Sequence, residues 1–498
     1  KDRALGIFSK AAHAMARVPA MRTGLLMLLA ASSVEASVQN PFAVGSRAQL
    51  FVDKVLVRSS ENIAFTPHPA RKHPGNPLIK VDRPEMERIW LCGSAIYDAE
   101  ERIFKMWYLS GNGTTYATSQ DGLTWEKQDV LWRGYMFANV WKDRADPDPA
   151  RRYKIIAWSP NAPGVLNTGY EPPIRTGYNT SVSADGKVVA PAHTQPICPK
   201  GDVIGGYYDR RLRLHVAFPK IGTDVNGFKR RCFYVATSTD FAKWTEPKPV
   251  LVPDLRDDAG SLARAEAVRS ILDAPLNLKQ MRTEFYGIGV YQQESCTIAF
   301  PWLFTVTGSL KGMPQEGPGE VQLAVTRDLQ QWERPFRTPA IPRGRAGEWD
   351  GGFFETAAEA FRVGDEIRLY YSASNRGHGQ RQRKLEHTFG IGLATWKLDR
   401  FVSADAPAEG GVLTTVPVAF TGSRLELNAA TKPGGQITVE VLNLAGQTVA
   451  QSKPFAGDDL RARLEWMQAV DLAALAGTPV SLRFRLKNAE FYSFAFRE

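Results

Sequence analysis

Short apolar runs alternate with turn-forming Gly, Pro, Asn and Asp along most of the chain after residue 48. The runs 89–97, 103–109 and 116–119 each have the length of a strand, and polar turns separate them. This pattern predicts β-strands joined by tight turns rather than helices. A similar order of strands begins again at four later positions: Met136, Val203, Phe285 and Gly352. We therefore expect five groups of strands.

The ends of these groups share one short phrase. Segments 118–125, 237–244 and 325–332 each carry an Asp followed four residues later by a Trp. The carboxylate suits a turn because it accepts hydrogen bonds from nearby backbone N–H groups, and the indole packs between sheets. Weaker copies occur at 181–186 and 391–399. Recurrence of such β-units predicts an all-β fold with a five-bladed β-propeller across residues 48–405.

The pattern changes after the last group. Pro407, Gly410 and Gly411 interrupt the chain, and residues 412–498 then alternate between apolar and polar positions. This predicts a C-terminal β-sandwich across 412–498. Within 254–283, residues 261–272 have a helical pattern, and we interpret this segment as an insertion between two blades.

The N-terminal segment is typical of an export signal. Arg22 precedes an apolar run at 24–31, and small residues around Ala36 follow it. The run is too short for a stable membrane span. We predict a signal peptide with an upstream extension across 1–37, a secreted or periplasmic protein, and no membrane association after cleavage.

Charge and cysteines exclude several classes of function. The net charge of +10 is scattered, and no basic stripe lies on a recognisable nucleic-acid module, so we expect no nucleic-acid partner. An anionic polysaccharide fits this charge, but so does a solvated surface. Cys92, Cys232 and Cys296 lie inside apolar strand patterns, which predicts free buried thiols. The cysteines and histidines have no metal-type spacing, so we predict no metal site.

A site at the mouth of a propeller would take residues from just before each inner strand and from the loops after each second strand. The acidic residues before the inner strands are Asp82, Glu85, Glu87, Asp202, Glu284 and Asp350. The loops add Asn112, Lys220, Arg376 and His378. Asp143 and Glu294 fall at turns on the opposite face and are not candidates.

Several carboxylates around one funnel suit glycoside hydrolysis, which needs one protonated acid and one ionised base or nucleophile. We predict Asp202 and Glu284 as catalytic residues, together with one of Glu85, Glu87 and Asp82. The predicted substrate-binding residues are Asp350, His378, Arg376 and Asn112. Each has a plainer alternative: Asp202 can shape the turn after Gly201, and His378 can be a solvated loop residue.

The chain resembles the five-bladed propeller glycoside hydrolases, a broad group that includes glycoside hydrolase families 32, 43, 68 and 130. The resemblance rests on the repeated Asp-to-Trp phrase, on His-Pro-Gly-Asn-Pro-Leu at 73–78 and on Leu-Phe-Val-Asp at 50–53. Leu-Arg-Phe-Arg-Leu at 482–486 and Tyr-Ser-Phe at 492–494 extend it to secreted bacterial family-32-like proteins. The Asn-Asp-Pro-Asn-Gly and Glu-Cys motifs of true family 32 are missing, which argues against sucrose or fructan as substrate.

The resemblance implies hydrolysis of O-glycosyl bonds in a poly- or oligosaccharide by a monomeric protein. It implies no required cofactor, although a structural calcium ion occurs in the wider group. Two alternatives stay open. One is a propeller that binds glycans without catalysis, and the other is a sialidase, which has six blades, an arginine triad and a tyrosine nucleophile.

Overall fold

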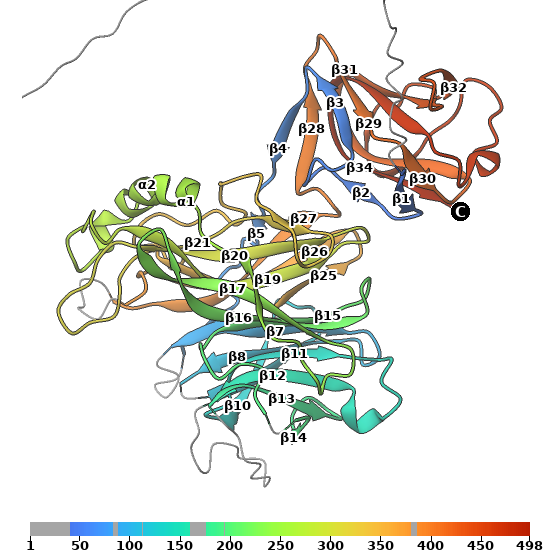
Figure 1. The fold of residues 1–498 in the computed structure, drawn as a ribbon. Helices are drawn as coiled ribbons and strands as arrows, with labels where there is room; N and C mark the ends of the chain where they lie inside the picture. Colours follow the sequence, from blue (N-terminus) through green and yellow to red (C-terminus); the bar gives the residue numbers. More distant parts are fainter. Residues whose placement is uncertain (1–39, 83–87, 112, 160–175, 194, 380–385) are drawn as a thin grey trace, which may run out of the picture. The chain divides into compact units, whose positions relative to one another are not determined.

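The computed structural model describes residues 40–82, 88–111, 113–159, 176–193, 195–379 and 386–498. Nearly all of its regular structure is β-strand (Figure 1), which confirms the expected all-β class. The expected signal segment within 1–37 lies outside the described residues, so its cleavage stays a prediction. From Pro41 onward the chain forms one compact unit.

Three antiparallel sheets of four strands follow one another along the chain. The first contains β7 (Ile89–Asp98), β8 (Ile103–Ser110), β9 (Gly113–Ser119) and β10 (Glu126–Arg133). The second contains β11 (Met136–Lys142), β12 (Tyr153–Ser159), β13 (Gly177–Ser183) and β14 (Ala190–Pro191), and the 3₁₀ turn η2 (Pro149–Arg151) lies between β11 and β12. The third contains β15 (Ile204–Asp209), β16 (Leu214–Val225), β17 (Phe228–Ser238) and β18 (Lys248–Leu251). Strands that follow one another in sequence pair in each of these sheets.

The fourth and fifth groups of strands are joined into one 11-stranded sheet. The fourth group contains β19 (Arg282–Gln292), β20 (Thr297–Val306), β21 (Gly319–Val321), β22 (Ala324–Thr326) and β23 (Trp332–Glu333). The fifth contains β24 (Phe353–Thr356), β25 (Glu359–Val363), β26 (Glu366–Ser374) and β27 (Phe389–Lys397). A short parallel pairing of β19 with β25 connects the two groups.

The first strand of the fifth group is broken, whereas the sequence pattern predicted one strand across 352–363. At the break, the Ala357 N–H donates to the Tyr370 carbonyl within the group. The Ala358 N–H donates instead to the Gly93 carbonyl of β7, at 2.8 Å. The backbone therefore changes partners between β24 and β25, which the apolar pattern alone does not reveal.

A segment from before the first sheet completes the fifth group. The two-residue strands β5 (Arg71–Lys72) and β6 (Ile79–Lys80) pair antiparallel with β27. Between them, the Asn76 side chain accepts a hydrogen bond from the Leu393 N–H at 2.9 Å and donates to the Leu393 carbonyl at 3.0 Å. The 73–78 segment that carried part of the resemblance thus binds the last long strand of the group.

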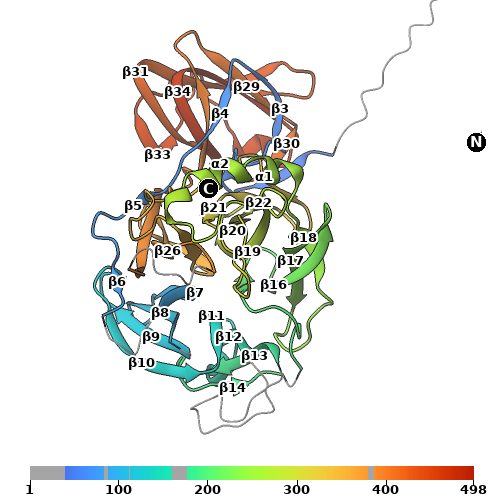
Figure 2. The ribbon, with the colours of Figure 1, turned by 90° about the vertical axis from the view of Figure 1, so that its left-hand side faces the viewer.

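The first strands of the five groups contact one another in cyclic order: β7, β11, β15, β19, β24 and β7 again. Figure 2 shows the groups arranged around these strands. Two glycines permit the close approach. A Cβ on Gly205 would lie 2.7 Å from Ile288, and one on Gly289 would lie 2.4 Å from the Ala357 carbonyl oxygen. Any larger residue at these two positions would push neighbouring strands apart.

The predicted turn phrase forms as expected. Asp121 Oδ1 accepts backbone hydrogen bonds of 2.7 and 2.8 Å from the residues two and three positions on. Asp240 and Asp328 accept the equivalent pairs. Trp125, at the end of the first phrase, packs edge-on against Tyr370, with ring centroids 5.4 Å apart. The phrase thus links a turn of the first group to strand β26 of the fifth group.

A nine-stranded sheet contains both ends of the described chain. Its strands are β2 (Gln49–Leu50), β3 (Val57–Glu61), β4 (Ala64–Pro67), β28 (Val402–Ala406), β29 (Gly411–Thr415), β31 (Arg424–Leu442), β32 (Thr448–Gln451), β33 (Asp458–Arg463) and β34 (Ser481–Arg497). The parallel pair β1 (Phe42–Gly45) and β30 (Val418–Phe420) and the turn η4 (Ala473–Leu475) accompany it. The predicted boundaries of the propeller at 48 and 405, and of the sandwich at 412, differ from the sheets of the structure. Strands β2, β3, β4 and β28 pair in the nine-stranded sheet rather than with the five groups.

The expected insertion forms α1 (Leu255–Ala259), α2 (Ser261–Glu266) and η3 (Arg269–Ile271) between β18 and β19. Asp257 of α1 accepts hydrogen bonds from the guanidinium groups of Arg334 and Arg337, which anchor the insertion to the fourth group. Among the helices in the described part of the chain, none has the length and apolar character needed to span a membrane.

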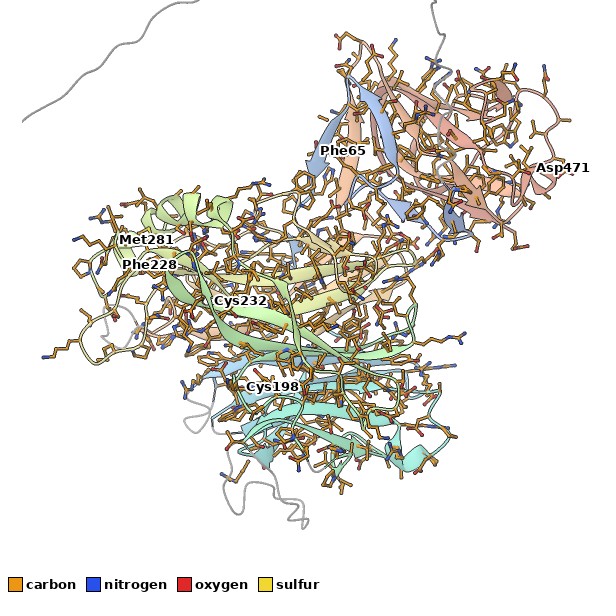
Figure 3. The ribbon with its side chains drawn as sticks, in the orientation of Figure 1. Phe65, Cys198, Phe228, Cys232, Met281 and Asp471 are labelled. Carbon is orange, nitrogen blue, oxygen red and sulfur yellow. The ribbon has the colours of Figure 1, made fainter. Side chains whose placement is uncertain are left out.

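All four cysteines are free and buried, as predicted for Cys92, Cys232 and Cys296. Figure 3 labels Cys232, on β17, and Cys198, in the loop before β15. Burial raises the pKa of each thiol, so none is activated as a thiolate.

Candidate active site

A cavity of about 870 Å³ opens beside the cyclic arrangement of first strands. Trp90 of β7, Phe353 and Glu355 of β24, and Phe389 of β27 line it. The loop after β26 adds its own side chains. Aromatic walls around a few polar groups are typical of a small-molecule or glycan pocket.

Glu355 is the buried carboxyl of this cavity. Glu355 and Ser372 lie opposite each other across the β24–β26 pair, and Ser372 Oγ donates a 3.2 Å hydrogen bond to Glu355 Oε2. Ser372 Oγ also accepts from the Leu91 N–H of β7 at 2.8 Å, which fixes its orientation. The Cys92 thiol is a further hydrogen-bond partner of the carboxyl. Three strands thus hold one acid in place.

Burial raises the pKa of Glu355 to about 7, because only 3% of the residue is exposed to solvent. The hydrogen bonds from Cys92 and Ser372 and the charge of Lys220 oppose this rise, and the negative charge of Asp202 adds to it. A carboxyl with this pKa carries a proton for a large fraction of the time at neutral pH. It can therefore donate a proton to a bound molecule.

Asp202 is a second carboxyl, in the opposite protonation state. It lies just before β15, accepts a 2.6 Å hydrogen bond from the Val203 N–H, and lies 2.5 Å from Lys220 Nζ. Burial opposes ionisation, but the charge and hydrogen bond of Lys220 outweigh it and lower the pKa of Asp202. About half of the side chain, 48%, remains exposed. An ionised carboxylate is thus presented to solvent.

Lys220 connects Asp202 to the interior. Its ammonium group lies 3.8 Å from the centroid of the Tyr286 ring, a cation–π contact. Burial lowers the pKa of Lys220, and the negative charge of Asp202 counteracts that effect. The buried cation therefore depends on Asp202 for its own stabilisation.

His378 lines the cavity and orients Tyr286. Burial lowers the pKa of His378 to about 4, so the imidazole is neutral at pH 7. Nδ1 lies 2.8 Å from the Gln315 carbonyl oxygen, which assigns the ring proton to Nδ1. Nε2 is then the acceptor for the Tyr286 hydroxyl, 3.1 Å away. This chain of hydrogen bonds holds Tyr286 beneath Lys220.

The predicted site residues divide into three sets. Arg376 and His378 line the cavity, and Asp202 acts electrostatically on Glu355. Glu284 is not a lining residue. It is 1% exposed, and its carboxylate binds Arg231 and, at 2.7 Å, Arg282. Paired with two arginines, Glu284 acts as a counter-ion.

Asp350 and Asp82 also lie outside the described lining of the cavity. Asp350 is buried, forms a 2.5 Å ion pair with Lys72 of β5, and accepts a hydrogen bond from the Tyr371 hydroxyl at 3.2 Å. Asp82 is exposed and pairs with Lys127 of β10. The first ion pair connects the loop before β24 to β5, and the second connects the segment after β6 to β10. The predicted residues Glu85, Glu87 and Asn112 lie outside the described residues.

Glu355 is not among the residues predicted from the sequence. The predicted acids precede inner strands, whereas Glu355 lies inside one, in Phe353-Phe354-Glu355-Thr356. A single acid within such an apolar strand was a usable signal, because a buried carboxyl needs partners or a function.

Among the described residues, no group of three or more His, Cys, Asp or Glu side chains is arranged to hold a metal ion. The structural calcium ion that the resemblance allows stays a prediction.

No protein-family model and no curated protein matches the chain. Several solved structures do. One is an N-acetylgalactosamine deacetylase from F. plautii in complex with blood group B trisaccharide, at 13% identity and a TM-score of 0.42, covering 70% of this chain and 97% of that one. Another is a thermostable family-43 glycoside hydrolase, at 12% identity and a TM-score of 0.41, covering 64% and 93%.

A third is a family-43 arabinoxylan arabinofuranohydrolase from Bacillus subtilis in complex with cellotetraose. Its identity is 11% and its TM-score 0.39, with 86% of this chain and 98% of that chain covered. The propeller glycoside hydrolases named by the sequence resemblance are thus among the solved structures similar to this chain. Because these TM-scores are low, the likeness carries no information on the chemistry of the site.

Proposed function

We propose that the protein is a glycoside hydrolase whose acid is Glu355 and whose ionised partner is Asp202. One observation carries this proposal: two carboxyls that act on each other electrostatically, Glu355 in the cavity and Asp202 beside Lys220, differ in protonation state near neutral pH. Glycosidic bond hydrolysis needs this combination. Lys220 helps to create it, because its charge favours the ionised form of Asp202.

In the proposed reaction, Glu355 donates its proton to the glycosidic oxygen as that bond breaks. Asp202 either accepts a proton from the attacking water or attacks the anomeric carbon itself, according to whether configuration is inverted or retained. In the second case, Glu355 later accepts a proton from the water that releases the sugar. The net reaction consumes one water. In the retaining route both carboxyls end in their starting states, and in the inverting route Asp202 returns its proton to solvent and Glu355 takes one up.

The cavity walls suit a sugar. Trp90 and Phe389 lie with ring centroids 6.2 Å apart, and Phe353 lines the same cavity. Aromatic faces of this kind cover the apolar C–H faces of a pyranose, while the polar groups take its hydroxyls.

The proposed architecture is a five-bladed β-propeller formed by β5 to β27 and a β-sandwich formed by β1 to β4 and β28 to β34. The cyclic contacts among the five first strands support the blade count. Completion of the last group by β5 and β6 also supports it, since such a segment closes the ring of blades. We further propose export, from the pattern at residues 1–37, and a monomeric protein.

A non-catalytic glycan-binding propeller is the second candidate, because the same aromatic cavity could bind a sugar without cleaving it. A sialidase is less well supported. Burial raises the pKa of Tyr286 well above its usual value, and its hydroxyl donates to His378. A tyrosine nucleophile would instead have to give up that proton.

The test is release of reducing sugar from a panel of plant, algal and microbial glycans. We expect activity on at least one glycan, and a loss of at least about 100-fold in kcat/KM for Glu355→Gln and for Asp202→Asn. Asp82→Asn is the matched control, since this acid pairs with Lys127 outside the cavity lining. Full activity in Glu355→Gln or in Asp202→Asn would rule out the assignment, and binding without cleavage of any glycan would favour the second candidate.

A further inference from the structure

We propose that the cavity binds a glycan carrying an oxyanion, either a uronate carboxylate or a sulfate, and that Arg376 and Arg88 recognise that group. This inference rests on the proposed function, since it names the substrate class of the same site. Two guanidinium groups line the cavity, that of Arg376 from the loop after β26 and that of Arg88 from the residue before β7.

Arg376 is the deeper of the two. Only 4% of the residue is exposed to solvent, although it lines the cavity. An ionic contact there is poorly screened by water, so it contributes more than the same contact at the surface. A guanidinium also presents two parallel N–H donors, a geometry that matches the two oxygens of a carboxylate or sulfate. The position therefore suits an anionic group better than a sugar hydroxyl.

Arg88 is exposed at the rim. Its guanidinium carbon lies 5.1 Å from the centroid of the Trp90 ring, another residue of the cavity wall. A sugar ring packed on Trp90 would thus bring its substituents within reach of Arg88. The aromatic surface and the cation act on the same unit of a glycan.

Among the described residues of the lining, the acids carry less charge than the two arginines. The described lining contains two carboxyls, Glu355 and Glu386. Because burial raises the pKa of Glu355 to about 7, this carboxyl is mostly protonated at mildly acidic pH and about half protonated at pH 7. His378 is neutral, and Lys220 pairs with Asp202. The net charge of the lining is therefore positive, in keeping with the +10 of the whole chain.

Binding is measured by titration calorimetry on the Glu355→Gln protein, which is expected to bind a substrate without turnover. One pair of probes is tetragalacturonate and its methyl ester, and the other is κ-carrageenan tetrasaccharide and its desulfated form. We expect the anionic member of one pair to bind at least about tenfold more tightly. Which pair responds identifies the oxyanion. The preference should fall as salt concentration rises.

Arg376→Gln should remove most of this preference, and Arg376→Lys should restore only part, since an ammonium lacks the two-donor geometry. Arg376 is buried, so its variants can fail to fold for reasons unrelated to binding. Two tests avoid this: glycan binding by Arg88→Gln, and the effect of salt on glycan binding by protein that keeps both arginines. Arg269→Gln is the matched control, because this exposed arginine pairs with Glu266 in the insertion, away from the cavity. Its binding should be unchanged.

Equal binding within both pairs, with no effect of salt or of Arg88→Gln, would overturn this inference. Hydrolysis of neutral glycans without any preference for anionic ones would also overturn it while leaving the proposed function intact. A strong anionic preference without hydrolysis would support the inference and contradict the proposed function.

Discussion

The ammonium group of Lys220 lies 2.5 Å from the carboxylate of Asp202. Lys220→Met keeps the apolar stem and removes the charge that lowers the pKa of Asp202. We expect this pKa to rise. The acidic limb of the plot of kcat/KM against pH should move to higher pH with it, because Asp202 acts in its ionised form.

Lys127→Met is the control for this change. Lys127 pairs with Asp82, outside the described cavity lining. Its acidic limb should stay in place. An unshifted limb in Lys220→Met would show that Asp202 does not control activity at low pH.

The basic limb of the same profile should report Glu355. Because burial raises the pKa of Glu355 to about 7, activity should fall as pH rises through that value and the acid loses its proton. The hydrogen bond from Ser372 lowers this pKa, so Ser372→Ala should raise it further and move the limb to higher pH. Movement to lower pH, or none, would contradict this role for Ser372.

A third prediction concerns stability. Asp399 is 6% exposed, and burial raises its pKa to about 6 despite a 3.2 Å hydrogen bond from Gln293. Glu294 adds to the rise, and Arg362 and Arg497 oppose it. A folded-state pKa above the unfolded value contributes stability at low pH that is lost as pH rises through about 6.

Asp399→Asn removes this titration. Asn suits the left-handed backbone at this position, where φ is 60°. The free energy of unfolding of the variant, relative to wild type, should therefore rise between pH 4 and pH 8 by on the order of 2–3 kcal/mol. Urea unfolding at both pH values measures it. A constant difference would show that Asp399 does not titrate in this range.

The fourth prediction concerns the helical insertion. Asp257 is 1% exposed, and its carboxylate accepts hydrogen bonds of 2.7–2.8 Å from Arg334 and Arg337. Asp257→Asn should lower the free energy of unfolding by about 3–5 kcal/mol, because two guanidinium groups lose their shared counter-ion. Glu465→Gln breaks the exposed pair with Lys453 and should change little. Equal effects of the two substitutions in urea unfolding would contradict this view.

The strand groups were predictable because their signals are local. Each signal acts within a few residues: an apolar run of strand length, an Asp that accepts hydrogen bonds from the next backbone N–H groups, and a Trp just before the following strand. Asp121 and Trp125 illustrate the last two. The pairing of β5 and β6 with β27 was not predictable, because two-residue strands have no periodicity. The break between β24 and β25 depends on Gly93 of a distant strand.

The site was predicted only in part for a related reason. Asp202, Arg376 and His378 lie in loops, where polar residues stand out in the sequence. Glu355 lies in an apolar strand, and its importance comes from burial beside Ser372 and Cys92, which only the fold brings together. Glu284 occupies an equivalent place in the sequence pattern to Asp202, yet Arg231 and Arg282 neutralise it.

The most direct test is a titration of the two carboxyls themselves, which needs no substrate. Carbon-13 NMR of protein labelled at the Glu and Asp carboxyl groups, with signals assigned by Glu355→Gln and Asp202→Asn, follows each one against pH. We predict that Glu355 titrates near pH 7 and that Asp202 titrates below the ordinary aspartate value of 3.8. Titration of Glu355 near the ordinary glutamate value of 4.5, or of Asp202 above its own, would contradict the proposed acid–base pair.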